Sequence, residues 1–195
     1  MNNTPDIILS GAMIIFVLFT GIKGIFLISR KINPFGKPPI HVSWFVLGKL
    51  CFVLTLAIVF FQAIGMESNL LQKSLPAMQW AGAGLVLTGS IFSVASLFEM
   101  GNIIKFGLPG EKTKLITKGI FRLSRHPMYA GFFLMMAGSV FYSPGLIIII
   151  PGIIAIIIHH FIIIAEERYL VKTFGEEYKN YKNRVNMYFN LNFKN

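Results

Sequence analysis

Five long apolar runs organise this chain. As a helix rising about 1.5 Å per residue, each can cross the roughly 30 Å of hydrocarbon in a bilayer, the fourth only barely. Lipid offers no partner to unpaired backbone groups, so we expect helices rather than open strands. The runs are Ile7–Ser29, Trp44–Ile64, Met78–Phe98, Pro127–Ser143 and Gly145–Ala165. The pattern predicts an all-α, polytopic membrane protein with about five transmembrane helices.

The last part of the chain follows a different pattern. Apolar and aromatic residues recur there at helical spacing, with Lys and Glu residues facing elsewhere. The apolar set is Leu170, Phe174, Tyr178, Tyr181 and Val185. We predict a C-terminal amphipathic helix that lies on the membrane or caps the protein.

Composition agrees with a membrane protein. Of the 195 residues, 54% are hydrophobic and only 13% are charged, whereas about a quarter of the residues are charged in an average soluble domain. No linker or repeat divides the chain, so we expect one domain over residues 1–195, with the motif-bearing part at 99–188. The single Cys51 lies inside an apolar run and allows no disulfide within the chain. We expect no metal site.

The formal net charge of +10 would suit nucleic-acid binding, but the basic residues follow the loops. Three lie in the first loop, six in the third and six in the C-terminal tail, whereas the second loop has only Lys73. This positive-inside pattern predicts an N-terminus outside and a C-terminus in the cytoplasm. We therefore interpret the charge as topology, with attraction to membrane lipids, and expect no nucleic-acid partner.

The third loop, Glu99–Arg125, is long for a connection between two spans. Glycine and proline turn points alternate in it with apolar and basic residues. Two interpretations stay open: the loop folds over a ligand at the cytoplasmic membrane surface, or it lies against the lipid headgroups.

Polar residues collect where this loop meets the fourth run. Pro127 suits the first position of a helix, because its missing N–H costs nothing there. His126 then lies at the helix boundary, where free backbone N–H groups favour an anion. Tyr129, on the first turn, offers its ring to a cation. The fifth run closes on Glu166-Glu167, with His159 seven residues earlier on nearly the same helical face.

These blocks together resemble the isoprenylcysteine carboxyl methyltransferases and the related phospholipid methyltransferases. The resemblance covers about 75 residues of the C-terminal half. It rests on Leu115-Ile116-Thr117-Lys118-Gly119-Ile120-Phe121, Arg125-His126-Pro127-Met128-Tyr129, Glu166-Glu167, and Phe174-Gly175-Glu176-Glu177-Tyr178 with Tyr181 and Arg184-Val185.

The resemblance implies an integral membrane methyltransferase that uses S-adenosylmethionine, with a site at the cytoplasmic face and a lipidic or prenylated acceptor. By position it implies cofactor-binding roles for Leu115, Ile116, Phe121, His126, Pro127, Met128, Tyr129 and Glu166. One departure bears on the acceptor. Ile162 stands where the eukaryotic carboxyl methyltransferases carry an Arg, which counts against a prenylcysteine carboxylate more than against the cofactor. His159, one turn away, is a partial substitute.

The acceptor decides what catalysis requires. A carboxylate needs no base, because its charge is cancelled together with that of the sulfonium. An amine must first be neutral, which needs burial or a base. Glu166 and His126 are the catalytic candidates for this role, and Tyr129 and Phe121 would stabilise the sulfonium by cation–π contact.

Two other classes remain open. Membrane reductases related to steroid 5-alpha-reductase, which use NADPH, carry a similar Arg-His-Pro-x-Tyr block. They usually continue Asn-Tyr-x-Gly-Glu, whereas this chain reads Met128-Tyr129-Ala130-Gly131-Phe132. The other class is a non-catalytic membrane protein that binds lipid or a partner.

Overall fold

The computed structural model describes residues 3–31, 36–66, 71–101 and 114–190. These residues form an all-α structure, which confirms the all-α part of the predicted fold class. Its helices are α1 (Thr4–Ser29), α2 (Val42–Ala63), α3 (Pro76–Glu99), the short 3-10 helix η2 (Gly119–Arg122), α4 (Pro127–Tyr142), α5 (Leu146–Phe174) and α6 (Glu176–Arg184).

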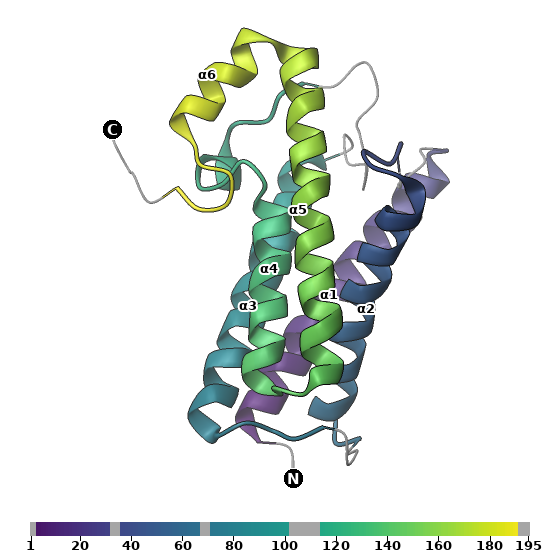
Figure 1. Cartoon of the computed structure of the whole chain (residues 1–195), viewed down its shortest axis with the longest axis vertical. Coiled ribbons are helices and arrows are strands. Elements are labelled where there is room, and N and C mark those ends of the chain that lie inside the picture. Colours follow the sequence, from purple (N-terminus) through teal and green to yellow (C-terminus); the bar gives the residue numbers. More distant parts are fainter. Residues whose placement is uncertain (1–2, 32–35, 67–70, 102–113, 191–195) are drawn as a thin grey trace.

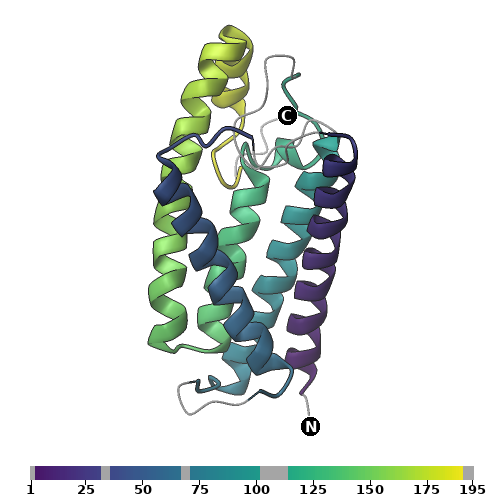
Figure 2. The same ribbon diagram turned by 90° about the vertical axis from the view of Figure 1, so that its right-hand side faces the viewer.

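Four of these helices, α1, α2, α3 and α5, are long and apolar enough to cross a membrane. The fourth predicted run forms a shorter apolar helix, α4, of 16 residues. At 1.5 Å per residue it is about 24 Å long, less than the full hydrocarbon thickness. The five helices run side by side, and the chain passes alternately up and down the bundle (Figures 1 and 2).

This up-and-down path gathers the basic segments at one end of the bundle. The end of α1, the start of α2, η2 and α6 all lie at the top in Figure 1, whereas the N-terminus lies at the bottom. Of the third loop, residues 99–101 and 114–125 are described. Lys105, Gly107, Pro109, Gly110 and Lys112 lie outside the described residues. The sequence therefore placed the basic loops at a common end correctly.

Glycines let α3 and α4 pack backbone against backbone. A Cβ added at Gly82 would lie 2.7 Å from the carbonyl oxygen of Gly138, and one added at Gly138 would lie 2.7 Å from that of Gly82. Gly89 and Gly131 form a second such contact one level nearer the basic end. Gly84, by contrast, has no neighbour within 4 Å of an added Cβ. The close helix approach expected from small residues thus depends on Gly82 and Gly89.

A buried carboxylate anchors the opposite end of the bundle. Asp6 of α1 is 1% exposed. It accepts a hydrogen bond from the Tyr142 hydroxyl of α4 at 2.6 Å and pairs with Lys73 Nζ at 2.7 Å. Because both partners come from other parts of the chain, this cluster fixes α1 against the end of α4 and the segment before α3.

The predicted C-terminal helix divides into two. Residues Leu170 and Phe174 belong to α5, which continues nine residues beyond the predicted end at Ala165. The chain turns at Gly175, whose φ of +52° is one that side-chain-bearing residues rarely adopt. Helix α6 then folds back, and its buried Tyr178 and Tyr181 pack against the end of α5 and Leu115. This packing agrees with the predicted capping role, and the position of α6 on the membrane stays a prediction.

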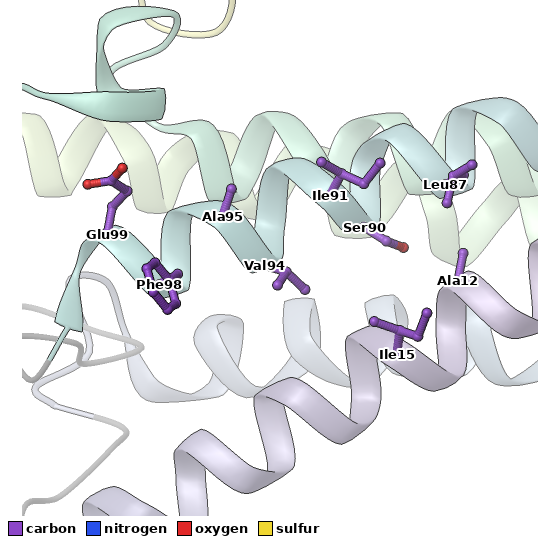
Figure 3. A pocket seen from close by; sticks show the side chains of 9 residues that line it. All are labelled: Ala12, Ile15, Leu87, Ser90, Ile91, Val94, Ala95, Phe98 and Glu99. Carbon is purple, nitrogen blue, oxygen red and sulfur yellow. The ribbon is translucent and has the colours of Figure 1, made fainter.

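An apolar groove of about 370 Å³ lies between α1 and α3 (Figure 3). Its side chains are almost all apolar, with Ser90 in the middle and Glu99 at the end nearest η2. It is separate from the polar residues at the start of α4 described below.

The glycine contacts give a matched pair of variants. We expect Gly82→Ala to destabilise the protein by about 1–3 kcal/mol, because the new methyl group overlaps the α4 backbone. Gly84→Ala, two residues away in the same helix, should leave stability unchanged or slightly raised. Thermal unfolding of both variants in detergent micelles checks this. Equal melting temperatures for the two would contradict the packing described here.

Candidate functional site

Helix α4 begins where the sequence predicted, with Pro127 at its first position. His126 precedes it with φ −128° and ψ 60°. The backbone N–H of His126 lies 3.0 Å from Ser124 Oγ and 3.2 Å from the carbonyl oxygen of Met187. The start of α4 is therefore fixed by contacts to the C-terminal segment as well as by the proline.

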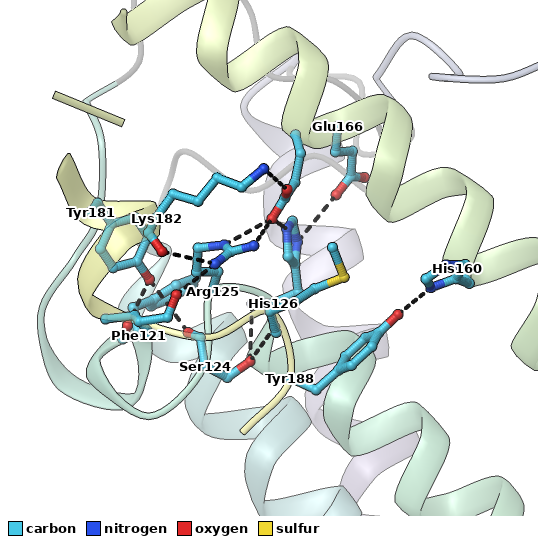
Figure 4. Close-up of polar contacts among 12 residues, drawn as sticks. Phe121, Ser124, Arg125, His126, His160, Glu166, Tyr181, Lys182 and Tyr188 are labelled. Atoms are coloured by element: carbon cyan, nitrogen blue, oxygen red, sulfur yellow. Dashed lines mark hydrogen bonds and ion pairs between the residues drawn. The ribbon is translucent and has the colours of Figure 1, made fainter. Parts of the chain in front are cut away.

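Glu166 of α5 meets the first turn of α4. The Tyr129 hydroxyl donates to Glu166 Oε1 at 2.7 Å. His126 Nδ1 lies 3.9 Å from Glu166 Oε2 (Figure 4). His126 is 6% exposed and Tyr129 is 3% exposed. Glu166 is 37 residues from Tyr129 and 40 from His126 in the sequence, and the three side chains form the polar cluster at the basic end of the bundle.

Glu167, the next residue, shares His126 with Glu166, since His126 Nε2 lies 3.4 Å from Glu167 Oε1, and it has further partners of its own. Its Oε1 accepts from Arg125 Nε at 2.8 Å and from Nη2 at 2.5 Å, and its Oε2 lies 3.1 Å from Lys182 Nζ. Arg125 and Glu167 are both buried, at 9% and 5% exposed. A buried carboxylate is tolerated only when it is paired and hydrogen-bonded, and this one is.

Arg125 also holds the end of α6. Its Nη1 donates to the Val185 carbonyl oxygen at 2.6 Å and to that of Lys182 at 3.2 Å. One planar guanidinium therefore joins the start of α4, the end of α5 and the end of α6.

Residues 185–190, here called the C-terminal strap, lie along residues 123–126. Arg125 N–H donates to the Asn186 carbonyl oxygen at 3.0 Å, and Asn190 N–H donates to that of Leu123 at 2.7 Å. Tyr188 of the strap hydrogen-bonds His160 Nδ1 through its hydroxyl (Figure 4). The strap thus ties the entrance of α4 to α5.

A further set of contacts around Tyr181, here called the second layer, joins η2 to α6. The Tyr181 hydroxyl donates to the Phe121 carbonyl oxygen at 2.6 Å. Burial raises the pKa of Tyr181, so its phenol stays neutral and keeps this donor at physiological pH. Leu115 packs against the same tyrosine cluster.

The sequence-predicted site residues fall into two groups. His126 and Tyr129 meet Glu166, and Pro127 and Met128 lie buried beside them on the first turn of α4. Leu115 and Phe121 belong to the second layer around Tyr181, and Ile116 is half-buried in the segment between them. The cofactor role of each residue stays a prediction.

Sequence reasoning assigned no role to Arg125, Glu167, Lys182 or the strap. Arg125 and Glu167 both lie within the motifs quoted above, and one feature of the sequence could have indicated a role for Glu167. Two adjacent carboxylates at the end of an apolar helix need separate partners, because they point in directions about 100° apart. The partners themselves come from distant segments that the spacing does not bring together.

Comparison with known proteins identifies the family. The profile of the phospholipid methyltransferase family matches residues 77–177, which include all but the first residue of α3, and η2, α4 and α5 with the polar cluster. The chain belongs to the phospholipid methyltransferase family. This confirms the resemblance that the motifs predicted, and it favours a methyltransferase over the reductase and the non-catalytic alternatives.

The chain is also similar to individual members of neighbouring groups. It is 26% identical over 113 residues to a protein-S-isoprenylcysteine O-methyltransferase of Schizosaccharomyces pombe, covering 55% of this chain and 47% of that protein. It is 30% identical over 131 residues to the Rattus norvegicus protein of the same name, covering 60% and 44%. It is 29% identical over 124 residues to a methanethiol S-methyltransferase of Pseudomonas deceptionensis, covering 62% and 47%. The matched region spans about half the length of these relatives.

Arg125 gives a test of how the site is held together. We expect Arg125→Ala to destabilise the protein by about 3–5 kcal/mol, because Glu167 loses its guanidinium while it stays buried. The strap should also become more sensitive to protease. The control is Arg122→Ala, since Arg122 is exposed on η2. Thermal unfolding and limited proteolysis in detergent measure both effects, and similar results for the two variants would contradict a central role for the pair.

Proposed function

We propose that this protein is an S-adenosylmethionine-dependent membrane methyltransferase whose cofactor binds around Glu166, Tyr129 and His126. Family membership supports methyl transfer. The observation that carries the location is the convergence of these side chains from α4 and α5, with Tyr129 donating to Glu166 at 2.7 Å.

The chemistry of this cluster fits the proposed cofactor. Glu166 Oε2 lies 3.9 Å from His126 Nδ1, beyond hydrogen-bond distance, and so has capacity for a donor such as a ribose hydroxyl or an ammonium group. His126 Nδ1 faces Glu166, and its Nε2 lies 3.4 Å from Glu167 Oε1. The Tyr129 ring offers a π-face to a cation. Leu115, Ile116, Phe121, Pro127 and Met128 are the proposed walls, by the resemblance.

S-adenosylmethionine supplies a methyl group on a sulfonium, ready for in-line displacement. The protein's own part is to bind, orient and exclude water. Glu166 would accept hydrogen bonds from the cofactor, and the Tyr129 ring would face the positive charge of its sulfonium. The buried first turn of α4 would keep water from the reacting atoms. His126 and Glu166 are the groups available to accept a proton from a protic acceptor.

The acceptor is proposed only as a class. A lipidic or prenylated small molecule, methylated on a carboxylate or an amine, is the class implied by the resemblance. The similarity to a methanethiol S-methyltransferase adds a thiol to the candidates.

We further propose that residues 1–195 form one domain with five spans, in which α4 crosses the membrane together with the four longer helices α1, α2, α3 and α5. The 16 residues of α4 suffice if the bilayer thins locally or flanking residues reach the interface. The basic end, which carries the site, then faces the cytoplasm, by the positive-inside rule.

Glu166→Gln tests the cofactor site. We expect it to weaken S-adenosylmethionine binding by more than about tenfold, because the amide removes the negative charge and one acceptor oxygen. The control is Glu176→Gln, since Glu176 lies exposed on α6 and pairs with Lys179. Equilibrium binding to the purified protein in detergent measures both. Unchanged affinity in Glu166→Gln would remove Glu166 from the site.

Activity is tested by incubating membranes that contain the protein with methyl-labelled S-adenosylmethionine. Lipid, protein and small-molecule fractions are then separated. Label in one fraction, absent from membranes with the Glu166→Gln variant, is the expected result and identifies the acceptor class. Label in none of them, with a panel of carboxylate, amine and thiol acceptors, would contradict the proposed function.

A further inference from the structure

A buried histidine on α5 has a ring nitrogen without a hydrogen-bond partner among the described residues. His159 is 1% exposed. Its Nδ1 lies 2.7 Å from the Ala155 carbonyl oxygen, which can only accept, so Nδ1 carries the proton. Nε2 is buried without a hydrogen-bond partner among the described residues. In the neutral ring, Nε2 presents a lone pair.

Aromatic rings of α2 and α4 surround this imidazole. The ring centroids of Phe52, Tyr129 and Phe132 lie 6.0, 5.8 and 5.7 Å from that of His159. Since Nδ1 faces the backbone of its own helix, Nε2 is directed away from that backbone. Leaving a buried polar atom unpaired costs about 1–3 kcal/mol. Such an atom calls for a reason beyond packing.

His159 is joined to the proposed cofactor site through Tyr129. The same tyrosine whose ring packs on His159 donates its hydroxyl to Glu166. His159 lies seven residues before Glu166 in α5, which is about 10 Å along the helix toward the middle of the bundle. A molecule that reached the cofactor from the membrane interior would pass this level.

Two residues near His159 bear on the charge of that molecule. Ile162, one turn further along α5, is fully buried and apolar. Lys49 lies on α2, the helix that also carries Phe52 beside the His159 ring. A carboxylate acceptor would therefore need Lys49, whereas an acceptor that carries a proton would need a lone pair such as that of Nε2.

On the basis of the proposed function, we propose that His159 Nε2 binds the X–H group of the methyl acceptor, and that this acceptor is a neutral thiol or amine. A lone pair attracts S–H or N–H but repels a carboxylate, which can only accept. When the acceptor atom gains its methyl group, the new X–C bond forms as the C–S bond to the sulfonium breaks. The X–H proton passes to the Nε2 lone pair, which makes the ring an imidazolium, and a neutral thioether or methylated amine is left.

Two variants of the full-length protein separate binding from packing. His159→Phe keeps an aromatic ring and removes both nitrogens, and His159→Gln keeps a hydrogen-bond acceptor but no comparable base. Phe161→Leu is the control, because Phe161 is two residues away and 57% exposed on the outside of the bundle. The probes are dodecanethiol, dodecylamine and N-acetyl-S-farnesylcysteine, which offer a thiol, an amine and a carboxylate.

The first measurement is equilibrium binding of each probe to the cofactor-free protein. We expect the thiol or the amine to bind, and His159→Phe to weaken that binding about tenfold, the loss of one buried hydrogen bond. His159→Gln and Phe161→Leu should weaken it by less than about threefold. S-adenosylmethionine affinity should stay unchanged in all three variants. In the transfer assay, His159→Gln should have a lower kcat, and its profile of kcat against pH should lack the ionisation of the basic group.

Three results would overturn the inference. One is methylation of the farnesylcysteine but of neither the thiol nor the amine. Another is that His159→Phe binds the thiol and the amine with the same affinity as the wild-type protein. The third is methyl transfer that is abolished in Lys49→Met but intact in both His159 variants. That result would mean that the acceptor is a carboxylate bound by Lys49. Failure of the wild-type protein to bind S-adenosylmethionine would instead contradict the proposed function, and the probe-binding measurement stands apart from it.

Discussion

The pairing of buried Arg125 with buried Glu167 is the interaction on which the geometry of the site depends. Charges removed from water are stable only when good geometry and further hydrogen bonds compensate their lost hydration. Arg125 meets this condition with two donors on Glu167 and one on the carbonyl oxygens of Lys182 and Val185. Because the guanidinium is planar and rigid, these partners can be satisfied together in only one arrangement of α4, α5 and α6.

This arrangement also sets the direction of Glu166. Neighbouring side chains on a helix point about 100° apart. Once Glu167 is turned toward Arg125, Glu166 is turned toward the first turn of α4, where Tyr129 donates to it. A pair with no proposed part in chemistry thus orients the carboxylate that has one. The strap adds to this, since its carbonyl groups bind the backbone of Arg125 and His126 just before α4 begins.

The depth at which α4 begins is set elsewhere, along its contact with α3 and at the far end of the bundle. Gly82 with Gly138 and Gly89 with Gly131 bring the two backbones together at two levels, which fixes their register. Tyr142 is held at the end of α4 by Asp6. A rigid helix fixed at its far end carries its first turn, and so the polar cluster, to a defined position.

The sequence by itself determined the class of fold, the common end of the basic loops, the start of α4 at Pro127 and the family. Each of these depends on local pattern: apolar runs long enough for a bilayer, a proline that suits a helix start, and motifs of fixed spacing. Only the tertiary structure decided that Tyr129 donates to Glu166 while Arg125 and Lys182 pair with Glu167, and that Gly175 divides the C-terminal helix. It also decided that α6 packs back on the end of α5, and that one nitrogen of His159 has no hydrogen-bond partner among the described residues. The physical reason is that the partner of a buried polar atom depends on how distant segments pack together. The spacing of residues within one segment does not contain that information.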